Sequence, residues 1–254
     1  MPDTFLITII FIAACTFIGA LVKGRSKDRC LKDINGYPVT FRMKDGKLVW
    51  GRLHVENTGL ELMYDAPYRD KSHEETSYIL YKSEYENILA IIRYKDELTE
   101  KENLGIAEDL EKTKRPSGFT RGMRNTRNIF GTVRDSLMEI AGLFVGRMKS
   151  AMPAGKILEG QDKYITKMQQ EGMSVVGTAY EPVLEKYIGK KTVLAVAGPE
   201  GKEEYSGILK EYTAAFIEML DTEHKDADGS IRKADIVVPR SAGVVRHSGS
   251  MEAE

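Results

Sequence analysis

Cysteine is scarce in this sequence, since the 254 residues contain only Cys15 and Cys30. Two cysteines cannot form the disulfide framework of a small secreted domain, and we expect both to be free thiols in a reducing compartment. An excess of charge is also lacking, because 37 basic residues face 38 acidic ones and the net charge is -1. A dedicated nucleic-acid-binding domain is usually basic, so this balance argues against one.

Motifs for catalysis and cofactor binding are missing as well. The sequence contains no phosphate-binding loop, no dinucleotide fingerprint and no nucleophile elbow. Asp226 and Asp228 match two places of a calcium loop, but His224 stands where that loop begins with aspartate. A polar loop between two strands accounts for the same residues. We therefore expect no catalytic residue, no metal and no cofactor, and predict a protein that is not an enzyme.

The one long apolar run, residues 5–22, carries no charge over 18 residues. A helix of that length, at about 1.5 Å per residue, nearly crosses a hydrocarbon core. The chain has no basic leader before the run, as a cleaved signal peptide would, and the run stays apolar after Cys15, unlike a lipoprotein. We therefore predict a retained single-span anchor. Its marker residues are Phe5, Ile9, Ile12, Phe17 and Val22.

Basic residues follow the apolar run at once. They are Lys23, Arg25, Lys27 and Arg29, with only Asp28 opposing them. The positive-inside bias then places the N-terminus outside and the rest of the chain in the cytoplasm. The predicted localisation is the cell (inner) membrane, with a single pass and with membrane lipid as a partner.

A stretch in the first third of the chain recurs near its end, at residues 36–65 and 189–221. In the first copy, apolar residues alternate with polar ones from Val39 to Met43, which is the period of a half-buried strand, and Asp45-Gly46 supplies a turn. The two copies align without a gap. In that alignment Gly51 meets Gly207, Leu53 meets Leu209, Leu60 meets Phe216, and Asp65 meets Asp221. This agreement indicates two copies of one small β module.

The module resembles the Sm-like family of small, strongly bent five-stranded barrels. The second copy carries the resemblance in Pro182, Leu184, Tyr187, Ile188, Gly189, Lys190, Val193, residues 207–209 and residues 236–247. RNA-binding members carry two short recognition elements, and the corresponding places here hold residues 55–58 and 83–86 in the first copy, and 211–214 and 240–243 in the second. None of these matches the RNA-reading pattern. The resemblance therefore implies the fold and edge-to-edge assembly rather than RNA recognition.

Helices are predicted between the two copies. Residues 95–113 are acidic, residues 112–134 are basic, and residues 126–149 give the strongest helical periodicity of the chain. One face of that last helix is apolar and is expected to pack on protein or to lie on lipid. It consists of Ile129, Phe130, Val133, Leu137, Ile140, Phe144 and Met148.

The predicted fold is mainly β with α: an N-terminal transmembrane helix and two Sm-like small β-barrels joined by a helical connector. The predicted domains are the anchor with its basic segment (1–30), the first barrel (31–94), the connector (95–180), the second barrel (181–248) and a disordered tail (249–254). We expect a membrane-anchored, non-catalytic scaffold that presents its barrels as a homo-oligomer or within a membrane protein complex. The alternatives are a membrane-tethered RNA-binding protein, with RNA the less favoured partner, and an accessory subunit of a channel or transport complex.

Overall fold

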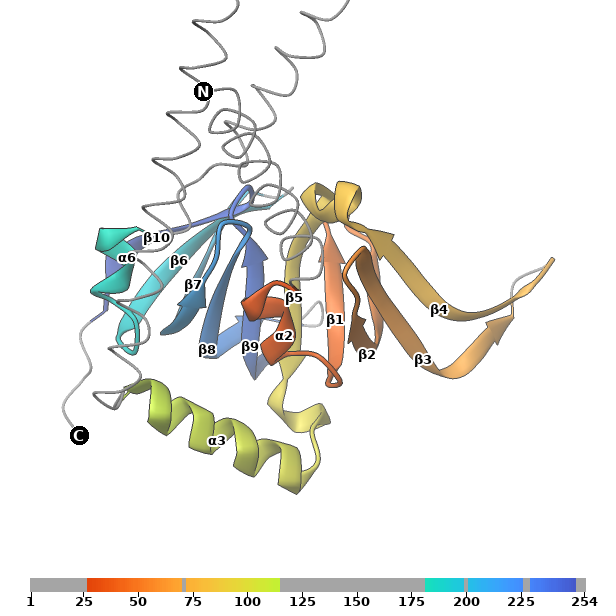
Figure 1. Ribbon diagram of the computed structural model, residues 1–254, viewed down its shortest axis with the longest axis horizontal. Helices are drawn as coiled ribbons and strands as arrows, with labels where there is room; N and C mark the ends of the chain where they lie inside the picture. Colours follow the sequence, from red (N-terminus) through yellow and green to blue (C-terminus); the bar gives the residue numbers. More distant parts are fainter. Residues whose placement is uncertain (1–26, 70–71, 115–180, 199–200, 226–228, 250–254) are drawn as a thin grey trace, which may run out of the picture.

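The computed structural model describes residues 27–69, 72–114, 181–198, 201–225 and 229–249. Ten strands in this part of the chain form one continuous antiparallel sheet (Figure 1). The strands are β1 (Pro38–Met43), β2 (Leu48–Val55), β3 (Gly59–Arg69), β4 (Glu74–Tyr81), β5 (Ile88–Tyr94), β6 (Lys191–Gly198), β7 (Gly201–Tyr212), β8 (Phe216–Lys225), β9 (Ile231–Pro239) and β10 (Gly243–Ser248). The helical elements are α2 (Arg29–Asp33), η1 (Lys82–Asn87), η2 (Lys95–Glu97), α3 (Glu100–Lys114) and α6 (Pro182–Glu185).

The order of strands across the sheet is β10-β6-β7-β8-β9-β5-β1-β2-β3-β4. Each group of five strands thus follows the same order, with its fifth strand beside its first. The groups are joined where β5 pairs with β9. The predicted fold of two barrels joined by a helical connector is therefore wrong, because backbone hydrogen bonds between β5 and β9 merge both groups into one sheet. Side-chain periodicity indicates that a segment is a strand, but it does not identify the strand that pairs with it.

The first strands form as their sequence predicts. Strand β1 alternates half-buried and buried residues, and β2 alternates exposed and buried ones. Between them Gly46 has a φ of 87°, which suits glycine, and Asp45 accepts a hydrogen bond from the Lys47 amide at 2.9 Å. Strands β3 and β4 continue into a hairpin that projects from the sheet (Figure 1). The outer part of that hairpin is exposed on both faces, so its sequence does not alternate between apolar and polar residues as a half-buried strand does.

The two groups share details of backbone bonding. Gly36 and Gly189, which precede their first strands, have φ values of 85° and 77°. Their amides donate to the carbonyls of Leu53 and Leu209 at 2.7 and 2.8 Å. A side chain at Gly51 would come within 2.5 Å of the Met63 carbonyl oxygen, and one at Gly207 within 2.7 Å of the Leu220 carbonyl oxygen. Both glycines therefore lie on the second strand of their group, close to the third.

Two apolar cores lie on opposite faces of the strands at the centre of the sheet. Every residue of β5 is buried, and Ile91 contributes to the first core while Ile92 contributes to the second. The first core also takes Phe216 and Val237 from the second group of strands. The halves are therefore packed together as well as hydrogen-bonded.

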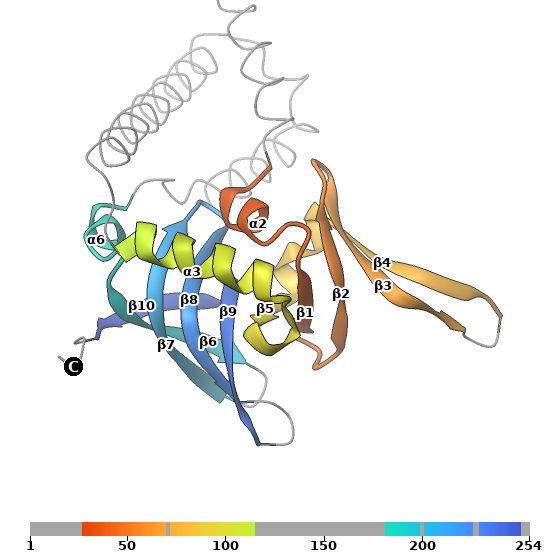
Figure 2. The ribbon, with the colours of Figure 1, turned by 90° about the horizontal axis from the view of Figure 1, so that it is seen from below.

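Helix α3 crosses the second group of strands on its outer face (Figure 2). It accounts for most of the helix predicted over residues 95–113. The helix is mostly polar, and Ile106 is its one buried residue. Thr99 begins it as an N-cap: its hydroxyl accepts from the Glu102 amide at 3.3 Å, while Glu102 accepts from the Thr99 amide at 2.9 Å.

The predicted membrane localisation also needs correction. No helix among the described residues is long and apolar enough to cross a membrane, and the predicted span at residues 5–22 lies outside them. The predicted transmembrane helix and the predicted single-pass membrane localisation are therefore not supported. The predicted amphipathic helix at residues 126–149 lies outside the described residues as well.

Candidate interaction surfaces

The joint between the two halves is an antiparallel strand pair with a buried ion pair at its centre. Arg93 of β5 lies opposite Asp235 of β9, with 2% and 1% of their side chains exposed. Nη2 and Nε of Arg93 donate to Oδ2 of Asp235 at 2.7 and 3.2 Å. The other carboxylate oxygen accepts from the Asp221 amide at 2.9 Å. A buried charge pair with so many hydrogen bonds favours this pairing register over its neighbours.

Helix α2 belongs to the first half but contacts β7 and β8 of the second half. Asp28 caps it by accepting from the Cys30 amide at 3.0 Å. Cys30 is fully buried against Phe216, and burial raises the pKa of its thiol well above the usual value. Arg29 donates to the Tyr212 carbonyl at 3.2 Å and lies 3.6 Å from Glu211. A helix that precedes β1 therefore packs on strands of the second group.

Lys210 connects α2, α3 and the sheet. Its ammonium lies 2.5 Å from Asp109 of α3, 3.0 Å from Asp33 of α2 and 3.2 Å from Glu218 of β8. Burial opposes the charge on Lys210, but the three carboxylates outweigh it and raise its pKa. Glu218 is fully buried, and no donor in the described residues is aligned to hydrogen-bond either of its oxygens. Burial therefore raises the pKa of Glu218 well above its usual value of 4.5, although Lys210 opposes the rise.

Replacing Glu218 with Gln is expected to stabilise the protein increasingly as pH rises. Burial raises the pKa of the folded Glu218 carboxyl above that of the unfolded one, so the unfolded state releases its proton first and the stability of the natural protein falls as pH rises above about 4.5. Gln does not titrate. Urea unfolding in a series of buffers from about pH 4.5 upwards should show a growing advantage for Glu218→Gln. Glu61→Gln, on β3, is the control, because Glu61 is only half-buried. An advantage that stays flat or shrinks would contradict the prediction.

A second ion pair connects the halves near the other core. Both terminal nitrogens of Arg42, on β1, donate to Glu203 of β7, at 2.5 and 2.6 Å. The Tyr205 hydroxyl donates to the same carboxylate at 2.6 Å. Burial would raise the pKa of Glu203, but the bonds from Arg42 and Tyr205 outweigh it and lower that pKa. The Arg42–Glu203 pair thus joins a strand of the first half to a strand of the second half.

The ends of the sheet differ from the joint, because among the described residues the outermost strand at each end has one unpaired edge. In the described part of the chain, β4 pairs only with β3, and β10 pairs only with β6. Large apolar side chains are exposed near these edges. They are Met63 (46%), Ile79 (56%) and Tyr81 (59%) at the β4 end, and Val183 (66%) and Val244 (46%) at the β10 end. Unpaired strand edges with apolar neighbours are sites of strand addition.

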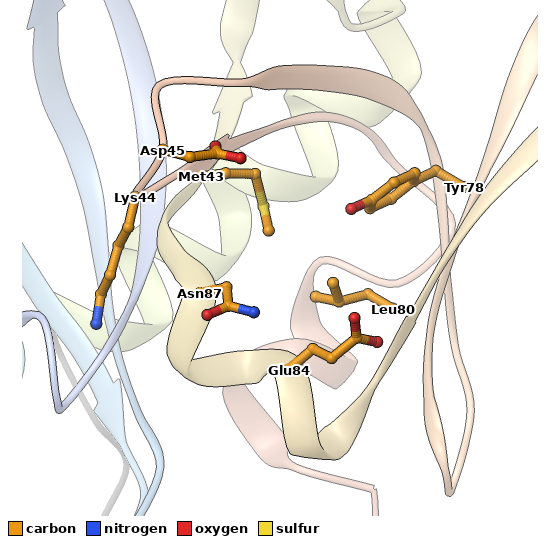
Figure 3. Close-up of a pocket in the computed structure, with 7 residues that line it drawn as sticks. All are labelled: Met43, Lys44, Asp45, Tyr78, Leu80, Glu84 and Asn87. Carbon is orange, nitrogen blue, oxygen red and sulfur yellow. The ribbon is translucent and has the colours of Figure 1, made fainter.

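A shallow pocket of about 460 Å³ lies between the β1–β2 turn, β4 and η1 (Figure 3). Its walls are Met43, Lys44, Asp45, Tyr78, Leu80, Glu84 and Asn87. Two hydrogen bonds in these walls stabilise the turns: the Lys44 amide donates to the Asn87 carbonyl at 2.8 Å, and Glu84 accepts from the Tyr81 amide at 2.9 Å. None of the wall residues has a buried polar atom that lacks a hydrogen bond.

The predicted site residues are only partly within the described chain. Of the basic residues, Lys27 lies 3.6 Å from Glu56, and Arg29 contacts Tyr212 and Glu211 of the second half. Lys23, Arg25, the anchor residues and the predicted apolar helix face lie outside the described residues. No group of three potential metal ligands occurs among the residues that are described.

Sequence reasoning missed the two joint residues. The available signal was a charge inside each apolar strand, Arg93 in one and Asp235 in the other.

Comparisons with protein-family models, curated proteins and solved structures give no match to this chain.

Proposed function

We propose that the protein is a non-catalytic assembly protein, whose two open sheet edges bind β-strands of other subunits. The observation that carries the proposal is the joint between β5 and β9, in which this chain associates its own halves by strand addition. The strands in the corresponding places at the ends of the sheet, β10 and β4, are unpaired on one side in the described chain. Strand addition to an open edge supplies main-chain hydrogen bonds, and exposed side chains supply specificity.

The polar clusters support a scaffold more than an enzyme. Three ion pairs, Arg93–Asp235, Lys210–Asp109 and Arg42–Glu203, each join elements distant in the sequence. Their charges are used in packing the sheet and its helices. The Sm-like resemblance forms part of the proposal, because both halves place their fifth strand beside their first.

Photo-crosslinking in cells tests the proposal. A photoreactive amino acid at Ile79 on β4 or at Val244 on β10 should crosslink to another polypeptide, because each lies at an open edge. Leu104 of α3 is the matched control, since it is apolar and 68% exposed but lies away from both edges. Yields at both edge positions no greater than at Leu104 would contradict edge binding.

A further inference from the structure

We infer that the partner at both edges is a second copy of this chain, joined head to tail by the same strand pairing that joins its halves. In this arrangement β10 of one copy lies beside β4 of the next. The inference rests on the proposed function, because it names the occupant of the proposed edges. Residues at the β5–β9 joint have counterparts at the two open ends, on β10 and β4.

The backbone bonding of the two halves supplies the alignment. Gly36 pairs with Leu53 as Gly189 pairs with Leu209, which aligns α2 with α6 and β2 with β7. Cys30 lies six residues before Gly36, as Val183 lies before Gly189. Cys30 and Val183 therefore occupy equivalent places on α2 and α6.

The strand registers align the edges in the same way. Leu60 faces Leu80 as Ile217 faces Val238, which makes Ile79 on β4 the counterpart of Val237 on β9. On the other side, β5 and β10 each pair with the first strand of their group. Phe41 pairs with Ile91 as Leu194 pairs with Val245, so Val245 is the counterpart of Ile91 and Val244 that of Ala90.

Four apolar residues exposed at the open ends have counterparts that are buried in the elements around the joint. Cys30, Ala90, Leu220 and Val237 are exposed by 0%, 1%, 1% and 1%. Their counterparts, in the same order, are Val183 (66%), Val244 (46%), Met63 (46%) and Ile79 (56%). Two of these lie at one end of the sheet and two at the other. One head-to-tail contact would bring both sets together and cover them, as the internal joint does.

The charges also fit a copy of the chain. In the joint, Asp33 of α2 lies beside Lys210, which contacts Glu218. The place of Asp33 is taken on α6 by Lys186, and the place of Glu218 is taken on β3 by Glu61. The contact between copies would thus place Lys186 near Glu61, two opposite charges. Ser248 and Ser77 take the places of Arg93 and Asp235, so this contact lacks the buried ion pair.

A contact of this kind is heterologous, because it joins two different surfaces. Repeating it gives a closed ring if the rotation between copies closes, and a filament if it does not. The contact itself is the same in either assembly, and the mass of the assembly distinguishes ring from filament.

Directed disulfide formation tests the register. With Cys15 replaced by Ser, Ile79→Cys and Val245→Cys in one full-length chain should form a covalent ladder under mild oxidation, because their counterparts Val237 and Ile91 are direct partners. Mixing the two single variants should stop at dimers, and either single variant alone should give little product. Tyr68→Cys with Val245→Cys is the control, since Tyr68 is as exposed but lies out of register. A ladder no stronger than this control would overturn the inference.

The assembled mass gives a second measurement. The full-length protein should be larger than a monomer in sedimentation, and Ile79→Asp should weaken assembly by about tenfold or more, because it buries an unpaired charge. Leu104→Asp should assemble normally. A monomeric natural protein, or assembly unaffected by Ile79→Asp, would overturn the inference. If the photo-crosslinks at Ile79 and Val244 then reach a different polypeptide, only the identity of the partner is wrong; if they are absent, the proposed function fails too.

Discussion

Asp235→Ala is expected to lower the free energy of unfolding by about 3–5 kcal/mol. The substitution leaves the Arg93 guanidinium, which is 2% exposed, without its carboxylate in the middle of the sheet. It also removes the acceptor of the Asp221 amide. An uncompensated buried charge costs far more than the pair contributes, because its desolvation is no longer offset. Urea unfolding of the full chain, followed by circular dichroism, measures the loss.

A double variant separates the lost pair from the lost side-chain volume. Arg93→Met with Asp235→Leu removes both charges and keeps apolar atoms at the joint, so most of the stability should return. If the double variant is no more stable than Asp235→Ala, packing rather than charge explains the loss. A loss below about 1 kcal/mol for Asp235→Ala would show that Arg93 reaches solvent or another acceptor.

The strands were predictable from the sequence because alternation reflects burial directly. Val39, Phe41 and Met43 are buried as expected, and Gly46 turns the chain between β1 and β2. Gly51 and Gly207 are recognisable because a β-carbon at either would meet the neighbouring strand. These features are local, so a pattern within one or two strands determines them.

The joint was not predictable in the same way. Strands β5 and β9 are separated by more than a hundred residues, and backbone groups that pair them are the same in every sequence. Strand β5 is buried on both faces, so it shows a continuous apolar run rather than an alternation. Reading that run as one wall of a separate barrel led to the wrong fold.

The gapless alignment of the two copies also failed in part. Leu53 faces Leu62 on β3, whereas Leu209 faces Met219 on β8, and the register shifts between Leu209 and Glu211. This bulge adds one residue to the second copy, so Leu60 corresponds to Ile217 rather than to Phe216. Phe216, which has no counterpart at Leu60, packs in the first core. This bulge has no strong sequence signal, because its extra residue is Lys210 and no glycine marks the position.

Each apolar core should depend on the other for its stability. Leu53→Ala and Leu209→Ala should each lower the free energy of unfolding by about 2–5 kcal/mol, because both side chains are fully buried. Leu53 lies in the first core and Leu209 in the second, while β5 contributes to both. Each variant should therefore unfold in a single transition at lower urea, with both halves lost together.

Leu104→Ala is the control for this pair, since Leu104 is 68% exposed and its loss should change stability by less than about 0.5 kcal/mol. The fluorescence of Trp50, the single tryptophan of the sequence, reports on β2 in the first half, and far-ultraviolet circular dichroism reports on the whole sheet. Because the halves share β5 and the buried Arg93–Asp235 pair, the two signals should change at the same urea concentration in Leu209→Ala. If the Trp50 signal instead persists after half of the sheet signal is lost, the first half folds without the second, and the joint is a contact between independent units rather than part of one cooperative sheet.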